Sequence, residues 1–290
     1  GVIAVITHSN VLPLKSYQPQ ADANKQPPIR QGFKVFADNR IRFNGQPIAI
    51  VVADTLERAT YAASLVSAQY QEEKYNTDLH EALKSGTALD GNAYKDYVRG
   101  EADAWKTATV KIEAEYEIPY EVHNPMEMHA ITVKWEADDK VTVYAKTQGV
   151  KATQRAIMNA FKLTDKNVQV YSEFMGGGFG MGLKTWPQEI AVVAAAKKLN
   201  RPVKLVQGRD QMFTTVGYRP QTIQKIGLGA TPDGKLTGMT HEVIAMTSSY
   251  EDFAENVVGM TRFMYETENI NTRFRLLPLD ISSPIWMRGP

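Results

Sequence analysis

The 290-residue chain carries 33 Lys and Arg against 32 Asp and Glu, for a formal net charge of +1, and 43% of its residues are hydrophobic. This is ordinary globular composition, and the basic residues are scattered, so no footprint for nucleic acid stands out. The apolar runs are much shorter than the ~20 residues that a membrane-spanning helix needs. The absence of cysteine excludes disulfides, zinc ribbons and any iron–sulfur cluster held by this chain. We therefore expect neither a nucleic-acid partner nor membrane insertion.

The first 86 residues predict a small α/β unit. A short strand opens the chain and meets a helix or turn start at Ser9 and Asn10. A buried strand over residues 48–52 precedes a cap signal at Asp54 and Thr55. The helix that follows has four apolar residues on one face, namely Leu56, Ala59, Ala63 and Val66. Because residues 87–105 are polar and lack sustained periodicity, we interpret them as a linker.

Residues 106–290 predict a second, larger α+β domain. Alternating apolar and polar residues indicate half-buried antiparallel strands over 109–122 and 130–148, with a hairpin turn at Asp138 and Asp139. Further elements follow in chain order: a helix over 150–163, a strand over 167–174, a helix over 186–200 and a strand over 201–207. A hairpin turns at Asp233–Gly234. We expect the remainder to be a loop-rich tail.

A run of glycines lies between the predicted strand at 167–174 and the helix near Trp186. Five of the seven residues 176–182 are glycine, and such a loop offers free backbone N–H groups beside the partial positive charge of a helix N-terminus. The phosphate-loop pattern fails because Leu183 follows Gly182, and the dinucleotide pattern fails as well. A tight turn without a ligand is the alternative interpretation. We favour close approach to a ligand, because three consecutive glycines are entropically costly in a mere turn.

Two other groups of residues were considered as metal ligands. His123, Glu127 and His129 lie in the segment HNPMEMH, but Pro125 breaks any helix that would align them, so we expect a hydrogen-bonded structural role. Met175 and Met181 flank the glycine run, and they suit core filling better than metal binding because no thiolate or imidazole accompanies them. We expect no metal ligand in this chain.

The glycine run MGGGFG resembles the loop of the large, molybdenum-binding subunit of the xanthine dehydrogenase and aldehyde oxidoreductase family of molybdenum hydroxylases. Six further segments agree in the same order along nearly the whole chain: GVIAVITHSNVLP, NGQPIAIVVADTLERA, HNPMEMHAITVKWE, KTQGV, RPVKLVQGRDQMFTTVGYRP and MRGP. The resemblance implies an α/β hammerhead-like domain in residues 1–86, truncated at its N-terminus. It also implies the first part of a molybdopterin-binding domain in residues 106–290. The bacterial aldehyde oxidoreductase branch is the most similar.

The resemblance also implies which residues meet the cofactor. Gln148 matches a glutamine that reaches an oxo ligand of molybdenum, and an amide can donate such a hydrogen bond. Gly177, Gly178, Phe179 and Gly180 match the loop that packs against the cofactor, with the phenylalanine beside the substrate. Arg288 matches an active-site arginine.

The family's catalytic glutamate lies closer to the C-terminus than this chain reaches. We therefore expect a fragment without a catalytic residue of its own, inactive in isolation. The implied reaction is hydroxylation of aldehydes or N-heterocycles with oxygen derived from water. Purine-oxidising members carry a glutamate where this chain has Leu183, which disfavours a xanthine substrate.

The implied cofactor is molybdopterin with molybdenum, in its cytosine dinucleotide form. The implied partners are an iron–sulfur subunit and an FAD subunit, which carry electrons away from a small aldehyde or heterocyclic substrate. The resemblance slightly favours the bacterial periplasm over the cytoplasm. Two alternatives remain open: a non-catalytic phosphate- or nucleotide-binding module that uses the loop at 176–180, and a module that serves subunit assembly only.

Overall fold

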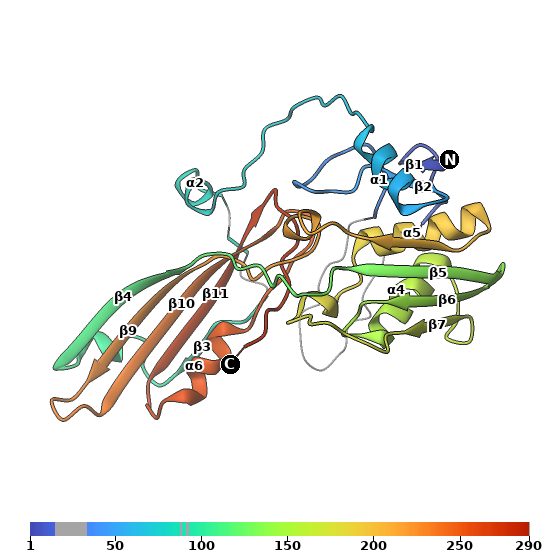
Figure 1. The fold of residues 1–290 in the computed structure, drawn as a ribbon. Helices are drawn as coiled ribbons and strands as arrows, with labels where there is room; N and C mark the ends of the chain where they lie inside the picture. Colours follow the sequence, from blue (N-terminus) through green and yellow to red (C-terminus); the bar gives the residue numbers. More distant parts are fainter. Residues whose placement is uncertain (15–33, 88, 91–92, 290) are drawn as a thin grey trace.

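The computed structural model describes residues 1–14, 34–87, 89–90 and 93–289. Gly91 of the predicted linker and Pro290 of the MRGP segment lie outside these residues. Figure 1 shows two sheets at opposite ends of the molecule, with the N-terminal unit lying over one of them. The prediction of a mixed α+β fold is confirmed.

The N-terminal unit is built on two short antiparallel strands, β1 (Val2–Ile6) and β2 (Ile50–Ala53), with α1 (Leu56–Ser64) packed beside β2. The helix begins where the sequence predicts, because the Thr55 hydroxyl accepts a hydrogen bond from the Arg58 N–H. An exposed segment then leads to α2 (Leu79–Lys84). This short helix packs on the second domain through Leu79.

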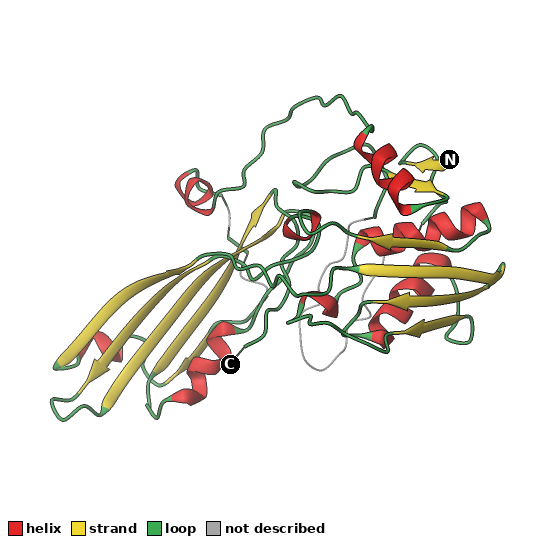
Figure 2. Cartoon of the chain, viewed as in Figure 1, coloured by secondary structure: helices red, strands yellow, loops and turns green. Residues whose placement is uncertain are grey.

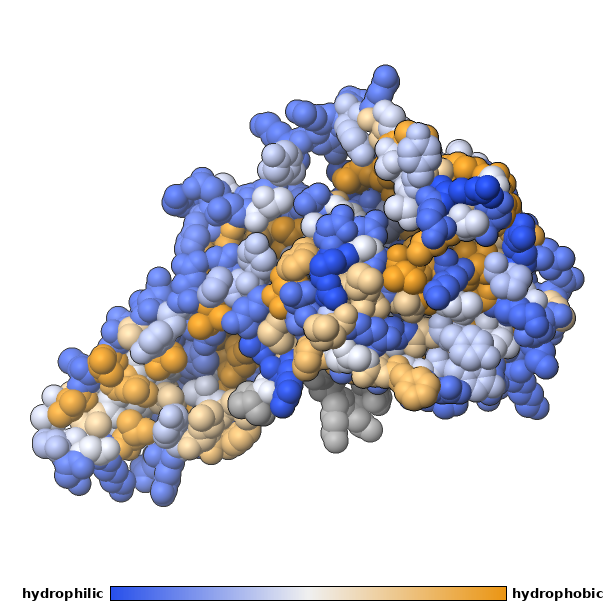
Figure 3. All heavy atoms as spheres, viewed as in Figure 1, coloured by the Kyte–Doolittle hydropathy of each residue, from blue (hydrophilic) through white to orange (hydrophobic). Residues whose placement is uncertain are grey.

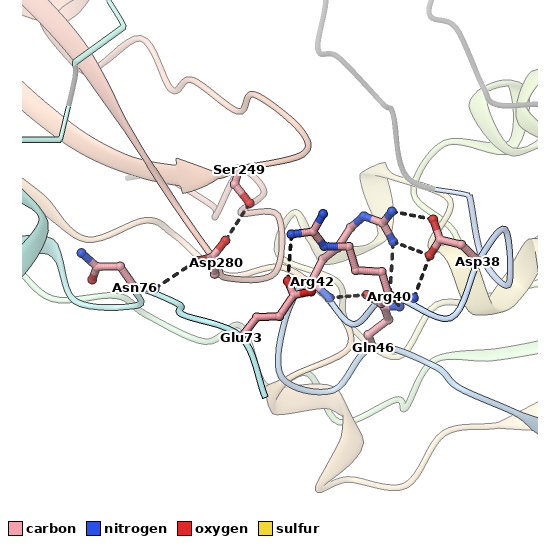
Figure 4. A network of polar contacts seen from close by, with 8 residues as sticks. All are labelled: Asp38, Arg40, Arg42, Gln46, Glu73, Asn76, Ser249 and Asp280. Atoms are coloured by element: carbon pink, nitrogen blue, oxygen red, sulfur yellow. Dashed lines mark hydrogen bonds and ion pairs between the residues drawn. The ribbon is translucent and has the colours of Figure 1, made fainter. Parts of the chain in front are cut away.

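Polar contacts tie this exposed segment to its neighbours (Figure 4). Asn76 N–H donates to the Asp280 carboxylate at 2.9 Å, and Asp280 N–H donates back to the Asn76 carbonyl at 2.8 Å. Arg40 pairs with Glu73 at 3.1 Å, and both side chains are largely exposed. The reciprocal Asn76–Asp280 pair therefore fixes the end of the segment, whereas the surface ion pair adds little.

The four-stranded sheet has the order β7-β6-β5-β8, with only β6 and β7 parallel. Its strands and the two helices packed on it are β5 (Ala130–Ala137), β6 (Lys140–Ala145), α4 (Val150–Phe161), β7 (Val168–Tyr171), α5 (Pro187–Leu199) and β8 (Val203–Val206). These elements share one hydrophobic core. All of them, and the turn at Asp138–Asp139, match the sequence prediction.

Helix α5 is covered on two sides, which explains its apolar sequence. Val192 and Val193 pack into the sheet core, whereas Ala191 and Ala195 pack against Ile6 and neighbouring residues of the N-terminal unit. A helix that is apolar all round belongs inside a protein. The N-terminal unit is therefore docked on the back of α5.

The five-stranded sheet has the order β3-β11-β10-β9-β4 and contains the longest strand, β10 (Figure 2). Its strands are β3 (Tyr97–Arg99), β4 (Val110–Ile118), β9 (Thr222–Ala230), β10 (Leu236–Ser248) and β11 (Ile270–Leu279). Helices α3 (Ala104–Thr107) and α6 (Val257–Met264) pack on it. The predicted hairpin at Asp233–Gly234 joins β9 and β10, and Gly234 has a φ of +90°.

Two expectations need correction here. The predicted loop-rich tail is wrong, because it contains α6 and the ten-residue strand β11, which pairs in parallel with β10. The segment that we interpreted as an unstructured linker contains β3, which pairs with β11, and the start of α3. The strands β3 and β11 each depend on pairing with a distant segment, so local periodicity does not reveal them.

Three glycines of the five-stranded sheet lie directly against Trp105 of α3. A Cβ at Gly227, Gly229 or Gly238 would lie 2.6–2.7 Å from atoms of Trp105. Trp105 is 7% exposed. These glycines therefore let the short helix α3 lie directly on the sheet.

Apolar residues of the edge strand β4 remain at the surface, among them Val110, Ile112 and Tyr116, and Figure 3 shows orange side chains exposed at this end of the molecule.

Candidate functional site

The glycine loop, residues 176–182, closes around the side chain of Gln148. The Gln148 Oε1 atom accepts hydrogen bonds from the Gly180 N–H at 2.9 Å and the Gly182 N–H at 3.1 Å. The Gln148 N–H donates to the Gly182 carbonyl at 2.8 Å. A Cβ at Gly178 would lie only 2.5 Å from Oε1. The glycine at 178 is therefore required by the approach of Gln148.

These contacts fix the orientation of the Gln148 amide. A backbone N–H can only donate, so the atom that accepts from Gly180 and Gly182 must be the oxygen. The nitrogen Nε2, with its two donor hydrogens, then has no acceptor among the described residues. Gln148 is exposed, so its NH₂ group is available to a ligand.

Three consecutive backbone donors of the loop are also free. Within the described part of the chain, no acceptor is found for the N–H groups of Gly177, Gly178 and Phe179. Phe179 has a φ of +53°, in the left-handed region that bulky residues rarely adopt. Such conformations cluster at functional sites. The loop thus offers a row of donors beside the free Gln148 amide.

The C-terminal segment closes the other side of the loop. The Arg288 N–H donates to the Phe179 carbonyl at 2.7 Å. A Cβ at Gly180, whose φ is +111°, would lie 1.9 Å from the Trp286 carbonyl oxygen. His123 Nε2 lies 2.7 Å from that same oxygen, and the Trp186 Nε1 donates to the Met181 carbonyl at 3.0 Å. The predicted residues Gln148, Gly177, Gly178, Phe179, Gly180 and Arg288 therefore come together, with Arg288 joined through its backbone and its side chain exposed.

The connection from the loop to helix α5 differs from the prediction. The end of the loop forms a 3-10 turn, Met181–Leu183, before the helix begins at Pro187, and Met181 is fully buried, as expected for core filling. The Glu189 carboxylate caps the first turn by accepting from the Trp186 N–H at 2.7 Å. The Trp186 N–H at the start of α5 is therefore satisfied by the chain itself.

Buried polar groups lie behind the loop. Both ring nitrogens of His129 and the Nζ of Lys146 lack hydrogen-bond partners within the described residues. Burial lowers the pKa of His129 to about 3, lowers the pKa of Lys146, and raises the pKa of Glu189 to about 8. The expected hydrogen-bonded role is thus confirmed for His123 and Glu127 but is wrong for His129. Its buried ring, just before β5, has no hydrogen-bond partner in the part of the chain that the structure describes.

The sequence predicts a structural role for Glu127 but neither its contact with the loop nor the part played by Arg209. The Glu127 carboxylate accepts from the Gly176 N–H at 2.8 Å, and the Glu127 N–H donates to the Gly176 carbonyl at 3.0 Å. Arg209 donates to Asn124, Pro125 and Met126. The only signal in the sequence is the segment HNPMEMH itself, whose partners lie about 50 to 85 residues further along the chain.

These features fit a pterin cofactor with an oxygen-bearing metal. The amide of Gln148 and the three free N–H groups are donors suited to oxo or phosphate oxygens, and the bare backbone of the loop admits a bulky group. No group of three His, Asp or Glu side chains that could hold a metal is found in the part of the chain that the structure describes.

Comparisons with known proteins agree with this geometry. Residues 86–290 match the family model of the molybdopterin cofactor-binding domain, and residues 1–74 match that of the aldehyde oxidase and xanthine dehydrogenase a/b hammerhead domain. The molybdenum-binding subunit PaoC of the Escherichia coli aldehyde oxidoreductase is 31% identical over the whole chain. The chain covers 38% of that relative's length.

Solved structures share the fold. The Desulfovibrio gigas aldehyde oxidoreductase superposes with a TM-score of 0.83 and 22% identity, covering 100% of this chain and 33% of that one. Quinoline 2-oxidoreductase from Pseudomonas putida gives 0.84 and 20%, covering 100% of this chain and 38% of that one. The two superpositions show that this chain shares the α+β fold of the matched parts of those proteins.

Because the first model matches well over half of the residues, the chain belongs to the molybdopterin cofactor-binding family of aldehyde oxidases and xanthine dehydrogenases. The resemblance and the fold class predicted from the sequence are thereby confirmed. Among the described residues, no helix has the length and apolarity needed to cross a membrane.

Proposed function

We propose that this chain is part of the molybdenum-cofactor subunit of an enzyme that hydroxylates aldehydes, giving carboxylic acids, or N-heterocycles. The cofactor would supply the redox chemistry and the water-derived oxygen. This chain's residues would bind the cofactor and orient it. The 31% identity to an aldehyde oxidoreductase subunit supports the aldehyde class.

One observation carries the proposal: the locked amide of Gln148. Because Oε1 is held by two backbone N–H groups, the NH₂ group can act only as a donor toward a ligand oxygen. The free N–H groups belong to the three residues that directly precede Gly180, which binds the Gln148 oxygen. An array that is fixed before the ligand arrives costs little reorganisation when it binds.

We also propose that the 290 residues alone do not turn over substrate. Three glutamates that contact the loop or the residues following it already have partners. Glu127 bonds to Gly176, Glu189 caps α5, and Glu251 pairs with Lys184. The base that removes the proton would then come from outside these residues. Substrate-dependent dye reduction by the isolated chain would contradict this proposal.

The finer assignments follow the same branch of the family. We propose the cytosine dinucleotide form of the pterin, an iron–sulfur partner and an FAD partner, and a compartment that is either the periplasm, which the branch resemblance slightly favours, or the cytoplasm. Exposed Leu183 beside the loop cannot hydrogen-bond a purine, which supports an aldehyde or a simple heterocycle over xanthine. Cell fractionation and co-purification test the compartment and the partners.

The decisive experiment measures molybdenum and cytidine nucleotide in the full-length subunit, purified with its co-purifying chains from a molybdate-fed host. Near-stoichiometric amounts of both are expected. If the assembled, folded protein lacks both but binds phosphate or a nucleotide at the loop, the cofactor proposal fails, and the free N–H groups belong to a non-catalytic binding module.

A further inference from the structure

The segment from His123 to Glu127 lies against the glycine loop, and the proposed cofactor-binding role of Gln148 and the free N–H groups does not explain it. Glu127 meets Gly176 through two hydrogen bonds of opposite direction. A Cβ at Gly176 would lie 2.8 Å from the Cβ of Glu127, and one at Gly177 would lie 3.3 Å from the Cβ of Pro125. The segment and the loop are thus in direct contact over two successive glycines.

Arg209 holds this segment in an unusual conformation. Its guanidinium donates to Asn124 Oδ1 at 2.9 Å, to the Pro125 carbonyl at 2.6 Å and to the Met126 carbonyl at 2.8 Å. Asn124 has a φ of +40°, in the left-handed region. A planar guanidinium with several fixed donors can bind three such acceptors at once, whereas an ammonium has no comparable fork. Arg209 therefore compensates for the strain at Asn124.

His123 extends the same segment to the opposite wall of the site. Its Nε2 lies 2.7 Å from the Trp286 carbonyl oxygen, the atom that packs against Gly180. One short segment thus contacts the first glycine of the loop at one end and the C-terminal wall at the other. The free N–H groups of Gly177, Gly178 and Phe179 lie between these two contacts.

We propose that Glu127 and Arg209 are positioning residues that set the conformation in which the glycine loop presents its free N–H groups to the cofactor. Arg209 fixes the conformation of the segment. The Glu127 carboxylate oxygen then holds the Gly176 N–H in place by accepting its hydrogen bond. The loop itself, rich in glycine, cannot hold one conformation unaided. The role in cofactor retention depends on the proposed function, whereas the effect on loop conformation does not.

The chemistry of Glu127 gives a sharp test. The contact to Gly176 needs an acceptor oxygen and does not need the negative charge, so E127Q can keep the hydrogen bond and E127A cannot. The control is E173A, since Glu173 is exposed at the start of the loop and has no hydrogen bond among the described residues. R209K and R209Q test the guanidinium in the same way.

The measurement is hydrogen–deuterium exchange of peptides that span residues 176–182 in the full-length subunit, together with molybdenum content and melting temperature. E127A, which loses one hydrogen bond to Gly176, and R209Q, which loses the three-acceptor contact of the guanidinium, should each raise loop exchange roughly tenfold or more and should lower the molybdenum content. E127Q should restore most of the protection, and E173A should match the wild type. R209K should fall between R209Q and the wild type.

Equal exchange in E127A, E173A and the wild type would overturn the proposal. So would equal effects of E127A and E127Q, because the acceptor would then not matter. A parallel rise in exchange over the whole chain, with a lower melting temperature, would indicate a general folding role and also contradict it. If the wild type carries no molybdenum, the proposed function fails, and the exchange data still decide whether these residues position the loop.

Discussion

Two glycine-rich regions of this chain serve different ends. Under Trp105, Gly227, Gly229 and Gly238 lie in paired strands, and the space that a side chain would take is filled by α3. In the loop at 176–182, glycines admit Gln148 and the Trp286 carbonyl, yet three successive N–H groups remain without acceptors in the described structure.

Glycine content alone therefore does not distinguish a segment used for close packing from one that binds a ligand. Both regions show close approach by the chain itself. What separates them is whether the backbone donors are satisfied, since buried or shielded N–H groups are almost always paired in native proteins. The following predictions test this distinction, beginning with the largest expected effect.

Replacing Trp105 with Ala should cost about 3–5 kcal/mol of unfolding free energy, because a large side chain is removed from a closely fitted sheet face. The exchange of amides at 176–182 should not change, since α3 packs on the other sheet. Chemical denaturation and hydrogen exchange of the same sample check both parts. An altered loop would show that the two glycine regions are coupled.

Replacing Gly180 with Ala should destabilise the site by about 2 kcal/mol or more, because the residue combines a positive φ with a backbone clash. G234A is the matched control: Gly234 has a φ of +90° but nothing within 4 Å of an added Cβ. A smaller loss in G234A would isolate the cost of the clash with Trp286. Equal losses would mean that backbone conformation alone matters. Thermal unfolding and molybdenum content report the outcome.

The substitution Q148E separates the acceptor role of residue 148 from its donor role. A carboxylate can still accept from Gly180 and Gly182, but it cannot donate to a ligand oxygen. We expect loop exchange to stay as in the wild type and kcat to fall roughly 10- to 100-fold in the full-length enzyme. Q169E, at an exposed site on β7, controls for the added charge. An unchanged kcat would show that hydrogen-bond donation by residue 148 does not contribute to catalysis.

Glu189 should make stability depend on pH. Its folded pKa of about 8 lies above the ordinary value of 4.5, so the folded state binds more protons than the unfolded state between these values. Stability is therefore fully present below pH 4.5 and is lost as the pH rises toward 8. Most of this loss should fall between pH 6.5 and 8, and it should be on the order of 2 kcal/mol.

The stability of E189Q should depend much less on pH between 6.5 and 8. His129 affects stability with the opposite sign, but only below this range. His129 stays neutral in the folded state down to about pH 3, so it lowers stability only as the pH falls below 6.5. Thermal unfolding as a function of pH measures both slopes. Identical slopes in E189Q and the wild type would show that Glu189 ionises normally.

The smallest effect is expected at the surface. E73Q removes the exposed ion pair with Arg40 and should change the unfolding free energy by less than about 1 kcal/mol, with no effect on the loop. A larger change, measured by denaturation at low and high salt, would mean that the exposed segment after α1 contributes more to stability than its burial suggests.

Local signals in the sequence were enough for much of the fold. The hairpin turns at Asp138–Asp139 and Asp233–Gly234 and the helix at 187–199 were predicted from turn residues and periodicity. Strand β11 was not, because its apolar residues are interrupted by Arg273, Arg275 and Pro278 and its partner β10 is recognisable only in three dimensions.

The candidate site shows the same limit. Gln148 and the loop were identified by resemblance, and their roles toward the cofactor stay predictions. The orientation of the amide and the contacts of Glu127 and Arg209 depend on tertiary structure, because each joins segments more than 30 residues apart. No local pattern encodes them.

The positions of two tryptophans have a practical consequence. Trp186 donates to the Met181 carbonyl beneath the loop, and Trp286 belongs to the wall that packs against Gly180. The chain has four tryptophans, so half of its intrinsic fluorophores touch the cofactor loop. We therefore expect the intrinsic emission of the native protein to change when the loop takes up its ligand, which would allow assembly to be followed without an engineered probe.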